Sequence, residues 1–343
     1  MLIGGTAGGK SSASCDQRSI ASAAGSAHNG TMGSQTFGVF GTGAVGGYFG
    51  GRLAEAGHDV RFVARGRQLA AIRDHGLRVS SVDGDFLIHP ARVADDPAAI
   101  GQVDVVLVAV KAWQVPEAGD AMRPMVGEST FVVPLQNGVE APDQLSAVLG
   151  RPRVLGGLCR ILAYLDGPGH IRHTGVTPYV AFGELDGSSS DRVEALRQAF
   201  TSTRGITVEV PSDIRVAMWS KFLFIAALGG VGALTRSPIG ALRRAAKSRE
   251  LLRQALEEIR AVALGRNILL PADIVDGTLA YIDTLPTDGT ASMQRDIMEG
   301  RPSELEAQVG AVVRLGDLVG VPVPVHRMIY QSLLPLERKA RAV

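Results

Sequence analysis

The sequence predicts an α/β domain built on a doubly wound, mostly parallel sheet, followed by an all-α C-terminal domain. From Thr36 to about Val210, short apolar strands alternate with helical segments, which is the pattern of a parallel sheet wound with helices. Runs of Val and Leu without polar alternation are typical of strands covered on both faces. We predict strands at residues 36–40, 59–65, 104–111, 130–135 and 207–210, with a helix at 190–202.

Two further changes of pattern complete the predicted architecture. Between Ile161 and Leu185, Gly and Pro interrupt β-forming residues, which predicts hairpins appended to the sheet. Pro211-Ser212-Asp213 reads as a turn followed by a helix N-cap, and no strand pattern follows it. Helical spacing then predicts helices at 213–234, 248–267, 271–285, 291–298 and 302–319.

The domain organisation follows from these boundaries. Residues 1–34 are small and polar and are expected to form a disordered N-terminal extension, with Met32 as a candidate translation start. Residues 35–211 form the predicted α/β domain and residues 212–340 the helical domain.

Composition excludes several classes of protein. The formal net charge of +1 provides no basic surface for nucleic acid or an anionic membrane. The apolar run from Phe222 to Leu234 is shorter than the roughly 18–20 residues that span a bilayer, so we predict a buried helix there. Cys15 and Cys159 are too few for a disulfide framework, which favours a reducing, cytoplasmic setting. No metal site is predicted, because His170 and His173 would point to opposite faces of a strand.

A glycine-rich turn follows the first predicted strand and opens a helix. It consists of Gly41, Thr42, Gly43, Ala44, Val45 and Gly46. In a Rossmann-type domain the first glycine allows a tight turn, the second lets the backbone approach a pyrophosphate, and the third lets the helix pack on the strand. The free N–H groups of the helix N-terminus then face the phosphates. The motif therefore predicts dinucleotide binding.

The end of the second predicted strand indicates which dinucleotide is bound. A protein that prefers NAD places Asp or Glu there, but this chain has Arg65, followed by Arg67. A guanidinium group pairs well with a phosphate dianion, so NADPH is the predicted cofactor. A solvated arginine after a strand is the alternative interpretation. Lys111 and Asn137 end two further predicted strands, where ligands of such sheets bind.

In order along the chain, the glycine turn, VARGRQL, VAVKAWQV, LQNGVE, WSKF, ASMQRDI and SELE resemble the ketopantoate reductase (2-dehydropantoate 2-reductase) family. The resemblance implies that Lys221 protonates the ketone oxygen of 2-dehydropantoate while NADPH delivers hydride, in pantothenate biosynthesis. It also implies that Lys111 and Asn137 hold the nicotinamide end and the substrate, that Ser292 binds the substrate carboxylate, and that Glu304 binds the cofactor. Burial on a helix should lower the pKa of Lys221. A lysine that extends from an amphipathic helix into solvent is the alternative for this residue.

The chain departs from the family in its substrate groove. The family carries asparagines where this chain has Ile225, Gly229 and Ile239. We therefore expect an apolar groove that is hollow at Gly229, and we keep a second hypothesis, a related reductase of a more apolar 2-oxo acid. Arg160 is an alternative partner for a substrate hydroxyl.

Other functions remain to be distinguished. A non-catalytic NADPH sensor is one alternative, but it would not require Lys221 together with Ser292 and Glu304. An opine or glycerol-3-phosphate dehydrogenase is another, but it would not predict the SKF and SELE segments at these positions. Helical second domains of this kind often contribute subunit contacts, so a homodimer is kept as a hypothesis.

Overall fold

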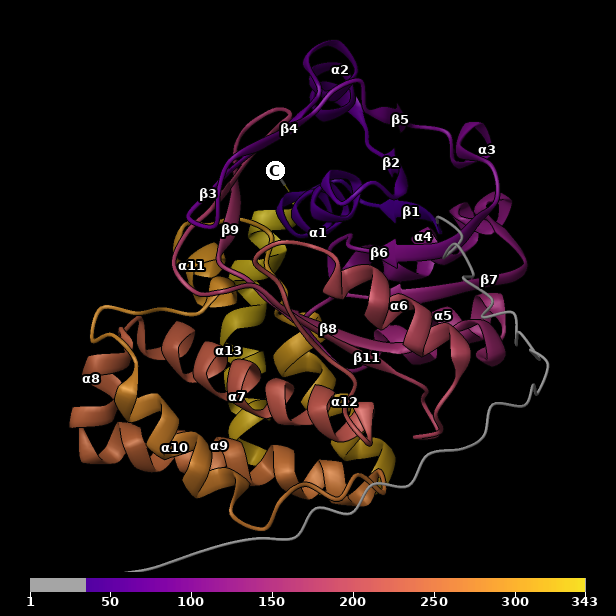
Figure 1. The fold of residues 1–343 in the computed structure, drawn as a ribbon. Helices are drawn as coiled ribbons and strands as arrows, with labels where there is room; N and C mark the ends of the chain where they lie inside the picture. Colours follow the sequence, from indigo (N-terminus) through magenta and orange to yellow (C-terminus); the bar gives the residue numbers. More distant parts are fainter. Residues whose placement is uncertain (1–34, 343) are drawn as a thin grey trace, which may run out of the picture. The chain divides into compact units, whose positions relative to one another are not determined.

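A five-stranded parallel sheet forms the centre of the first domain (Figure 1). The structure is a computed structural model that describes residues 35–342, so the predicted extension at 1–34, with Met32 and Cys15, lies outside the described residues. The strand order is β5-β2-β1-β6-β7. The bounds are Thr36–Phe40 for β1, Asp59–Val63 for β2, Arg92–Ala94 for β5, Val103–Val108 for β6 and Val126–Pro134 for β7.

Both faces of this sheet are covered, as its apolar runs predict. Along β6, Val105 and Leu107 pack into a core that contains side chains of α1, whereas Val106 and Val108 pack into a second core with α4 and α5. Successive side chains of a strand point to opposite faces, so a strand between two cores is apolar throughout. The helices of this domain are α1 (Ala44–Glu55), α2 (Gly66–His75), α3 (Pro97–Ile100), α4 (Val115–Ala121), α5 (Ala141–Leu149) and α6 (Asp191–Thr201), with short turns η1 (Ala112–Gln114), η2 (Arg123–Met125) and η3 (Arg151–Arg153).

The predicted hairpins do not join the central sheet, and that part of the prediction is wrong. They contribute to two smaller sheets with orders β4-β3-β10-β9 and β12-β11-β8. The reason is that β10 pairs in parallel with β3, a strand that the sequence pattern did not reveal. The bounds are Leu77–Ser81 for β3, Phe86–Ile88 for β4, Gly156–Arg160 for β8, Ala163–Gly167 for β9, His170–His173 for β10, Tyr179–Gly183 for β11 and Thr207–Glu209 for β12.

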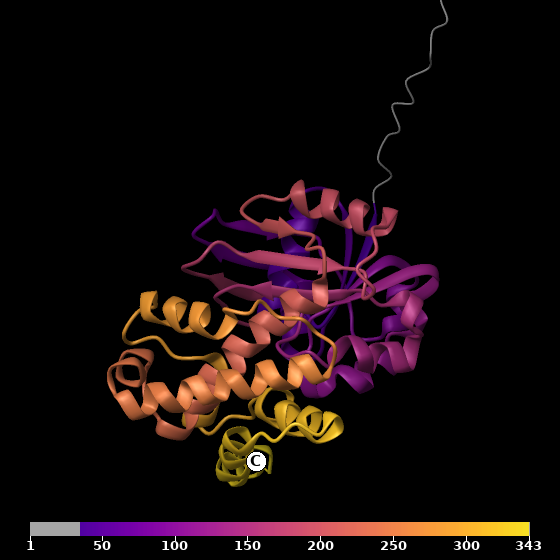
Figure 2. The ribbon, with the colours of Figure 1, turned by 90° about the horizontal axis from the view of Figure 1, so that it is seen from below.

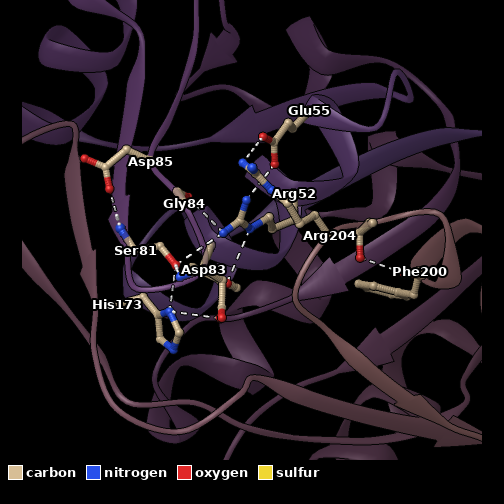
Figure 3. A network of polar contacts seen from close by, with 11 residues as sticks. Arg52, Glu55, Ser81, Asp83, Gly84, Asp85, His173, Phe200 and Arg204 are labelled. Atoms are coloured by element: carbon tan, nitrogen blue, oxygen red, sulfur yellow. Dashed lines mark hydrogen bonds and ion pairs between the residues drawn. The ribbon is translucent and has the colours of Figure 1, made fainter.

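A buried arginine attaches the β3–β4 turn to α1 (Figure 3). The side chain of Arg52 is fully buried, and its guanidinium donates to Glu55 at 2.7 Å, to Ser81 Oγ at 3.2 Å and to the carbonyl of Gly84 at 3.1 Å. Glu55 also forms an ion pair at 2.7 Å with Arg204, which lies in the segment between α6 and β12. Because the buried guanidinium is hydrogen-bonded and paired with a carboxylate, its burial is compensated, and α1 is held in place behind the glycine turn.

Within residues 35–342, no cluster of His, Cys, Asp and Glu is arranged to hold a metal. His173 is buried and its Nδ1 lies 2.8 Å from Ser81 Oγ, while His170 Nε2 lies 3.0 Å from Ser80 Oγ. Both histidines are thus used in joining β10 to β3.

After Glu209 the described chain contains helices only, as predicted. Asp213 caps the first of them, because its carboxylate accepts from the N–H groups of Arg215 and Val216. The helices are α7 (Ile214–Thr235), α8 (Ile239–Arg244), α9 (Ala246–Gly265), α10 (Ile274–Thr284), α11 (Ser292–Met298), the π-helical segment η4 (Glu306–Gly310), α12 (Ala311–Val319) and α13 (Pro324–Arg341). Figure 2 shows α7 and α9 alongside one another, and their side chains share one core with α12 and α13.

Two of these helices were not predicted. They are α8, which is short, and α13, whose sequence contains Pro324 and an internal Pro335. α7 is long and apolar enough to cross a membrane by length and composition, but 67% of its most apolar window is buried inside the protein. It is a core helix, as predicted for Phe222–Leu234.

Candidate active site

The glycine turn has the geometry that its sequence predicts. Gly41 has φ of +103°, and a Cβ there would lie 2.8 Å from the backbone N of Val110. A Cβ on Gly46 would lie 2.2 Å from the carbonyl oxygen of Gly41, so only glycine lets α1 approach the turn so closely. Gly43 is different, because a Cβ there would meet nothing within 4 Å. The turn is therefore closed on the protein side and open at Gly43, the N-cap of α1.

The turn is attached to the end of β2 through Thr42. Its hydroxyl donates to the carbonyl of Val63 at 2.9 Å, and its own carbonyl accepts from Gln68 Nε2 at 2.9 Å. Thr42 is 3% exposed, so its side chain holds the turn and does not point into the open space at Gly43. Arg65 and Arg67 follow β2, are exposed, and form no ion pair with any residue between 35 and 342. Both arginines thus follow the strand to which the turn is attached, and neither has an ion-pair partner among the described residues.

Lys221 projects from α7 toward the edge of the sheet domain. Its Nζ donates to the carbonyl oxygen of Cys159, at the end of β8, at 2.6 Å. Burial lowers the pKa of Lys221 below the usual range of lysine; the nearby Glu304 carboxylate offsets part of this effect, whereas the charge of Arg160 adds to it. The prediction that its pKa is lowered by burial agrees with this environment.

The two residues that precede Ile161 have different surroundings. Cys159 is buried, and burial raises the pKa of its thiol, so the sulfur stays protonated. Arg160 is exposed, and its guanidinium carbon lies 4.4 Å from the centre of the Tyr179 ring. The hydroxyl of Tyr179 in turn donates to Glu209 at 2.7 Å. Arg160 is thus stacked in place, with its charge close enough to affect Lys221.

Asn137 and Glu304 meet although they are far apart in the sequence. Asn137 Nδ2 donates to Glu304 Oε2 at 3.2 Å, and Gln308 Nε2 donates to the same oxygen at 3.3 Å. Asn137 lies in the turn after β7, and Glu304 lies before η4, so this contact joins the carboxyl edge of the sheet to the helical domain.

Lys111 lies three residues beyond β6 and is exposed. Its Nζ lies 5.8 Å from the centre of the Trp113 ring.

A cavity of about 240 Å³ begins one helical turn after Lys221 on α7. Its wall is mainly apolar, with polar side chains from Asn137, Thr290, Ser292 and Gln308. Ser292 is the exposed first residue of α11. The apolar wall consists of Phe224, Ile225, Leu228, Ile239, Leu285, Pro286, Gly289 and Ala291.

The expected hollow at Gly229 does not exist, so this detail of the prediction is wrong. A Cβ on Gly229 would lie 3.1 Å from Met293 Cε and 3.6 Å from Ala291 Cβ. The long side chain of Met293, from α11, fills the space that the missing side chain leaves. Ile225 and Ile239 do line the cavity, as the predicted apolar groove requires.

Comparison with known proteins identifies the family. Residues 37–187 match the family model described as ketopantoate reductase PanE/ApbA, and residues 213–337 match the model of the C-terminal part of the same family. The chain belongs to the ketopantoate reductase family. The resemblance stated from the motifs is thereby confirmed, and so is the class of enzyme, an NAD(P)-dependent oxidoreductase that acts on CH–OH groups.

Individual relatives agree with this assignment. The 2-dehydropantoate 2-reductase of Mesorhizobium japonicum is 33% identical over 307 residues, covering 83% of this chain and 93% of the relative. An uncharacterized oxidoreductase of Bacillus subtilis, YkpB, is 29% identical over 295 residues, covering 86% and 96%. The crystal structure of a PanE/ApbA family ketopantoate reductase from Ralstonia eutropha has a TM-score of 0.81 at 32% identity and covers 89% of this chain and 99% of its own.

Some residues of this candidate site were not predicted from the sequence. Gln308, buried against Glu304, follows it by one helical turn, and this spacing is a signal that could have identified it. Phe224, Leu285 and Thr290 line the cavity but carry no pattern that distinguishes them from core or loop residues.

Proposed function

We propose that this protein reduces a 2-oxo acid to a 2-hydroxy acid with NADPH, and that Lys221 donates the proton. The proposed substrate is 2-dehydropantoate, which gives pantoate for pantothenate biosynthesis in the cytoplasm. One observation carries the proposal: a lysine with a lowered pKa lies beside the Asn137–Glu304 contact that joins the two domains.

The residues at the glycine turn fit the proposed cofactor. Open space at Gly43 and the free N–H groups at the start of α1 suit a pyrophosphate. Arg65 and its neighbour Arg67 are available to pair with a 2′-phosphate, which distinguishes NADPH from NADH. When bound, NADPH supplies hydride to the carbon of the ketone.

Lys221 supports this reaction in two ways. As hydride adds to the carbonyl carbon, negative charge develops on the ketone oxygen, and a nearby ammonium group stabilises it. The same group then gives its proton to that oxygen, which completes the hydroxyl and leaves Lys221 neutral until solvent reprotonates it. A lowered pKa brings the lysine closer to the working pH, where a general acid is most effective.

The remaining predicted residues have roles around this centre. We assign Lys111 and Glu304 to the cofactor and Asn137 to both the cofactor and the substrate. Ser292 binds the carboxylate of the substrate. The hydrogen bond between Asn137 and Glu304 is consistent with these roles, because the substrate and the nicotinamide must lie close together for hydride transfer.

The cavity favours a second candidate, a 2-oxo acid with an apolar side chain. Ile225 and Ile239 offer no hydrogen bond to the hydroxyl of 2-dehydropantoate. An unmet buried hydroxyl costs about 1–3 kcal/mol, or roughly a factor of 5 to 150 in binding. Of the four polar side chains in the cavity wall, Asn137 and Gln308 already donate to Glu304, so Thr290 and Ser292 remain to bind that hydroxyl.

The test is NADPH oxidation with 2-dehydropantoate and a series of branched and aromatic 2-oxo acids. Lys221→Ala should lower kcat by about 10²–10⁴ with every acid that is turned over. Lys247→Ala removes an exposed lysine of α9 and serves as the matched control. Preference for apolar acids over 2-dehydropantoate would establish the second candidate. Tight NADPH binding without turnover of any acid would refute the enzyme and favour a sensor.

A further inference from the structure

The last turn of α13 contains a buried carboxylate that the proposed reaction does not use. Glu337 is 5% exposed, and its two oxygens each accept from the backbone N–H of Ser303 at 3.1 Å. The hydroxyl of Ser303 donates to Glu337 Oε2 at 2.5 Å, and Ser303 itself is fully buried. A buried carboxylate is destabilising unless it is paired and hydrogen-bonded. The three hydrogen bonds from Ser303 therefore fix Glu337 and Ser303 relative to one another.

Arg341 extends the same network to the sheet domain. Its guanidinium forms an ion pair with Glu337 at 2.7 Å and donates to the carbonyl of Ser303 at 2.9 Å. Its guanidinium carbon also lies 4.4 Å from the centre of the Trp113 ring, a cation–π contact. Lys111 lies on the same loop, with its Nζ 5.8 Å from that ring. One arginine near the C-terminus thus contacts segments of both domains.

The serine in this network directly precedes a proposed site residue. Ser303 Oγ accepts from the N–H of Leu305 at 3.2 Å. This hydrogen bond links the residues before and after Glu304, so it restrains the backbone of Glu304. The carboxylate of Glu304 then accepts from Asn137. Any shift of Ser303 would therefore move Glu304 relative to the sheet.

We propose that Glu337 and Arg341 are positioning residues that set the spacing between Glu304 and the Lys111–Trp113 loop, and that they thereby strengthen NADPH binding. The proposal rests on the proposed function, which assigns Lys111 and Glu304 to the cofactor. Neither positioning residue needs to touch the cofactor. They order its two contact segments before it binds, which lowers the entropy lost on binding.

The test compares Arg341→Ala with Arg338→Ala, which removes an exposed arginine from the same turn of α13. NADPH is titrated by its own fluorescence, and the emission of the two tryptophans, Trp113 and Trp219, is recorded without cofactor. We expect Arg341→Ala to weaken NADPH binding about tenfold, within the usual range of coupling between sites. We expect its tryptophan emission to change as well, whereas Arg338→Ala should leave both signals as in the wild type.

Two further variants keep the test valid if Arg341→Ala folds poorly. Arg341→Lys keeps the charge but loses the planar group, so it should recover only part of the affinity. In a Trp113→Phe background, replacing Arg341 with Lys should have a smaller effect than in the wild type, because the two side chains act through one contact. Equal affinities of the Arg341 and Arg338 variants, or full additivity with Trp113→Phe, would overturn the proposal.

These results are separate from the fate of the proposed function. Turnover that depends on Lys221, with no effect of Arg341, would leave the reductase standing and refute the positioning role. No turnover of any 2-oxo acid, with weakened NADPH binding in the Arg341 variant, would refute the reductase and leave the positioning role standing.

Discussion

Substituting the second and third glycines of the turn by alanine should separate binding from folding. A Cβ on Gly43 meets nothing within 4 Å, and the residue is extended at φ −83°, ψ −161°, a conformation that alanine adopts freely. Gly43→Ala should therefore fold as well as the wild type. Its methyl group would stand in the open space that we assign to the pyrophosphate, so NADPH should bind at least ~10-fold more weakly, or ~1.4 kcal/mol.

Gly46→Ala, by contrast, should lower the stability of the fold. Its Cβ would lie 2.2 Å from the carbonyl oxygen of Gly41 and 2.9 Å from both Val39 Cγ1 and Ala109 Cβ. Carbon atoms in contact prefer about 3.5–4.0 Å, so α1 would have to move by more than ~1 Å. Overpacking of this kind costs about 1–3 kcal/mol, and we expect the upper end because the nearest atom is backbone. In urea, with m near 3 kcal/mol/M, the midpoint would fall by ~1 M.

The assays are urea denaturation followed by circular dichroism and titration with NADPH. The reasoning is refuted if Gly43→Ala binds NADPH like the wild type, since the open space would then not hold the phosphates. It is also refuted if Gly46→Ala keeps the wild-type midpoint, since the close approach of α1 to the turn would then be dispensable.

Three further predictions follow from single contacts. Because burial lowers the pKa of Lys221, kcat should fall as pH rises through a value below that of an ordinary lysine, and this limb should vanish from the pH profile of Lys221→Arg. Arg65→Ala should raise KM for NADPH by about 10- to 100-fold and leave KM for NADH almost unchanged, as steady-state kinetics would show. Glu258 accepts from two N–H groups at the start of α13 and lies 2.7 Å from Nδ1 of buried His326. Glu258→Ala should therefore lower the free energy of unfolding by ~2–4 kcal/mol, while exposed Glu257→Ala should change it by less than ~0.5 kcal/mol in the same urea titration.

The parts of the fold that could be predicted depend on local rules. The strand at 36–40, the strand predicted at 59–65 and observed at 59–63, the cap Asp213 and the glycine turn are each specified by neighbouring residues. Backbone conformation, capping bonds and side-chain alternation act over a few residues, so they can be read directly from the chain. Helix α13 was missed because prolines begin and interrupt it, and because its stability comes from distant partners such as Glu258.

The candidate site divides in the same way. The sequence by itself determined the open glycine turn, the arginines after β2 and the apolar positions Ile225 and Ile239, because each depends on residue type at a local position. Only the tertiary structure decided that Met293 fills the space at Gly229, that Asn137 meets Glu304, and that Arg341 lies against Trp113. These contacts join residues that are 64, 167 and 228 positions apart. No local pattern encodes which distant side chain occupies a given space, because that depends on how the helices pack.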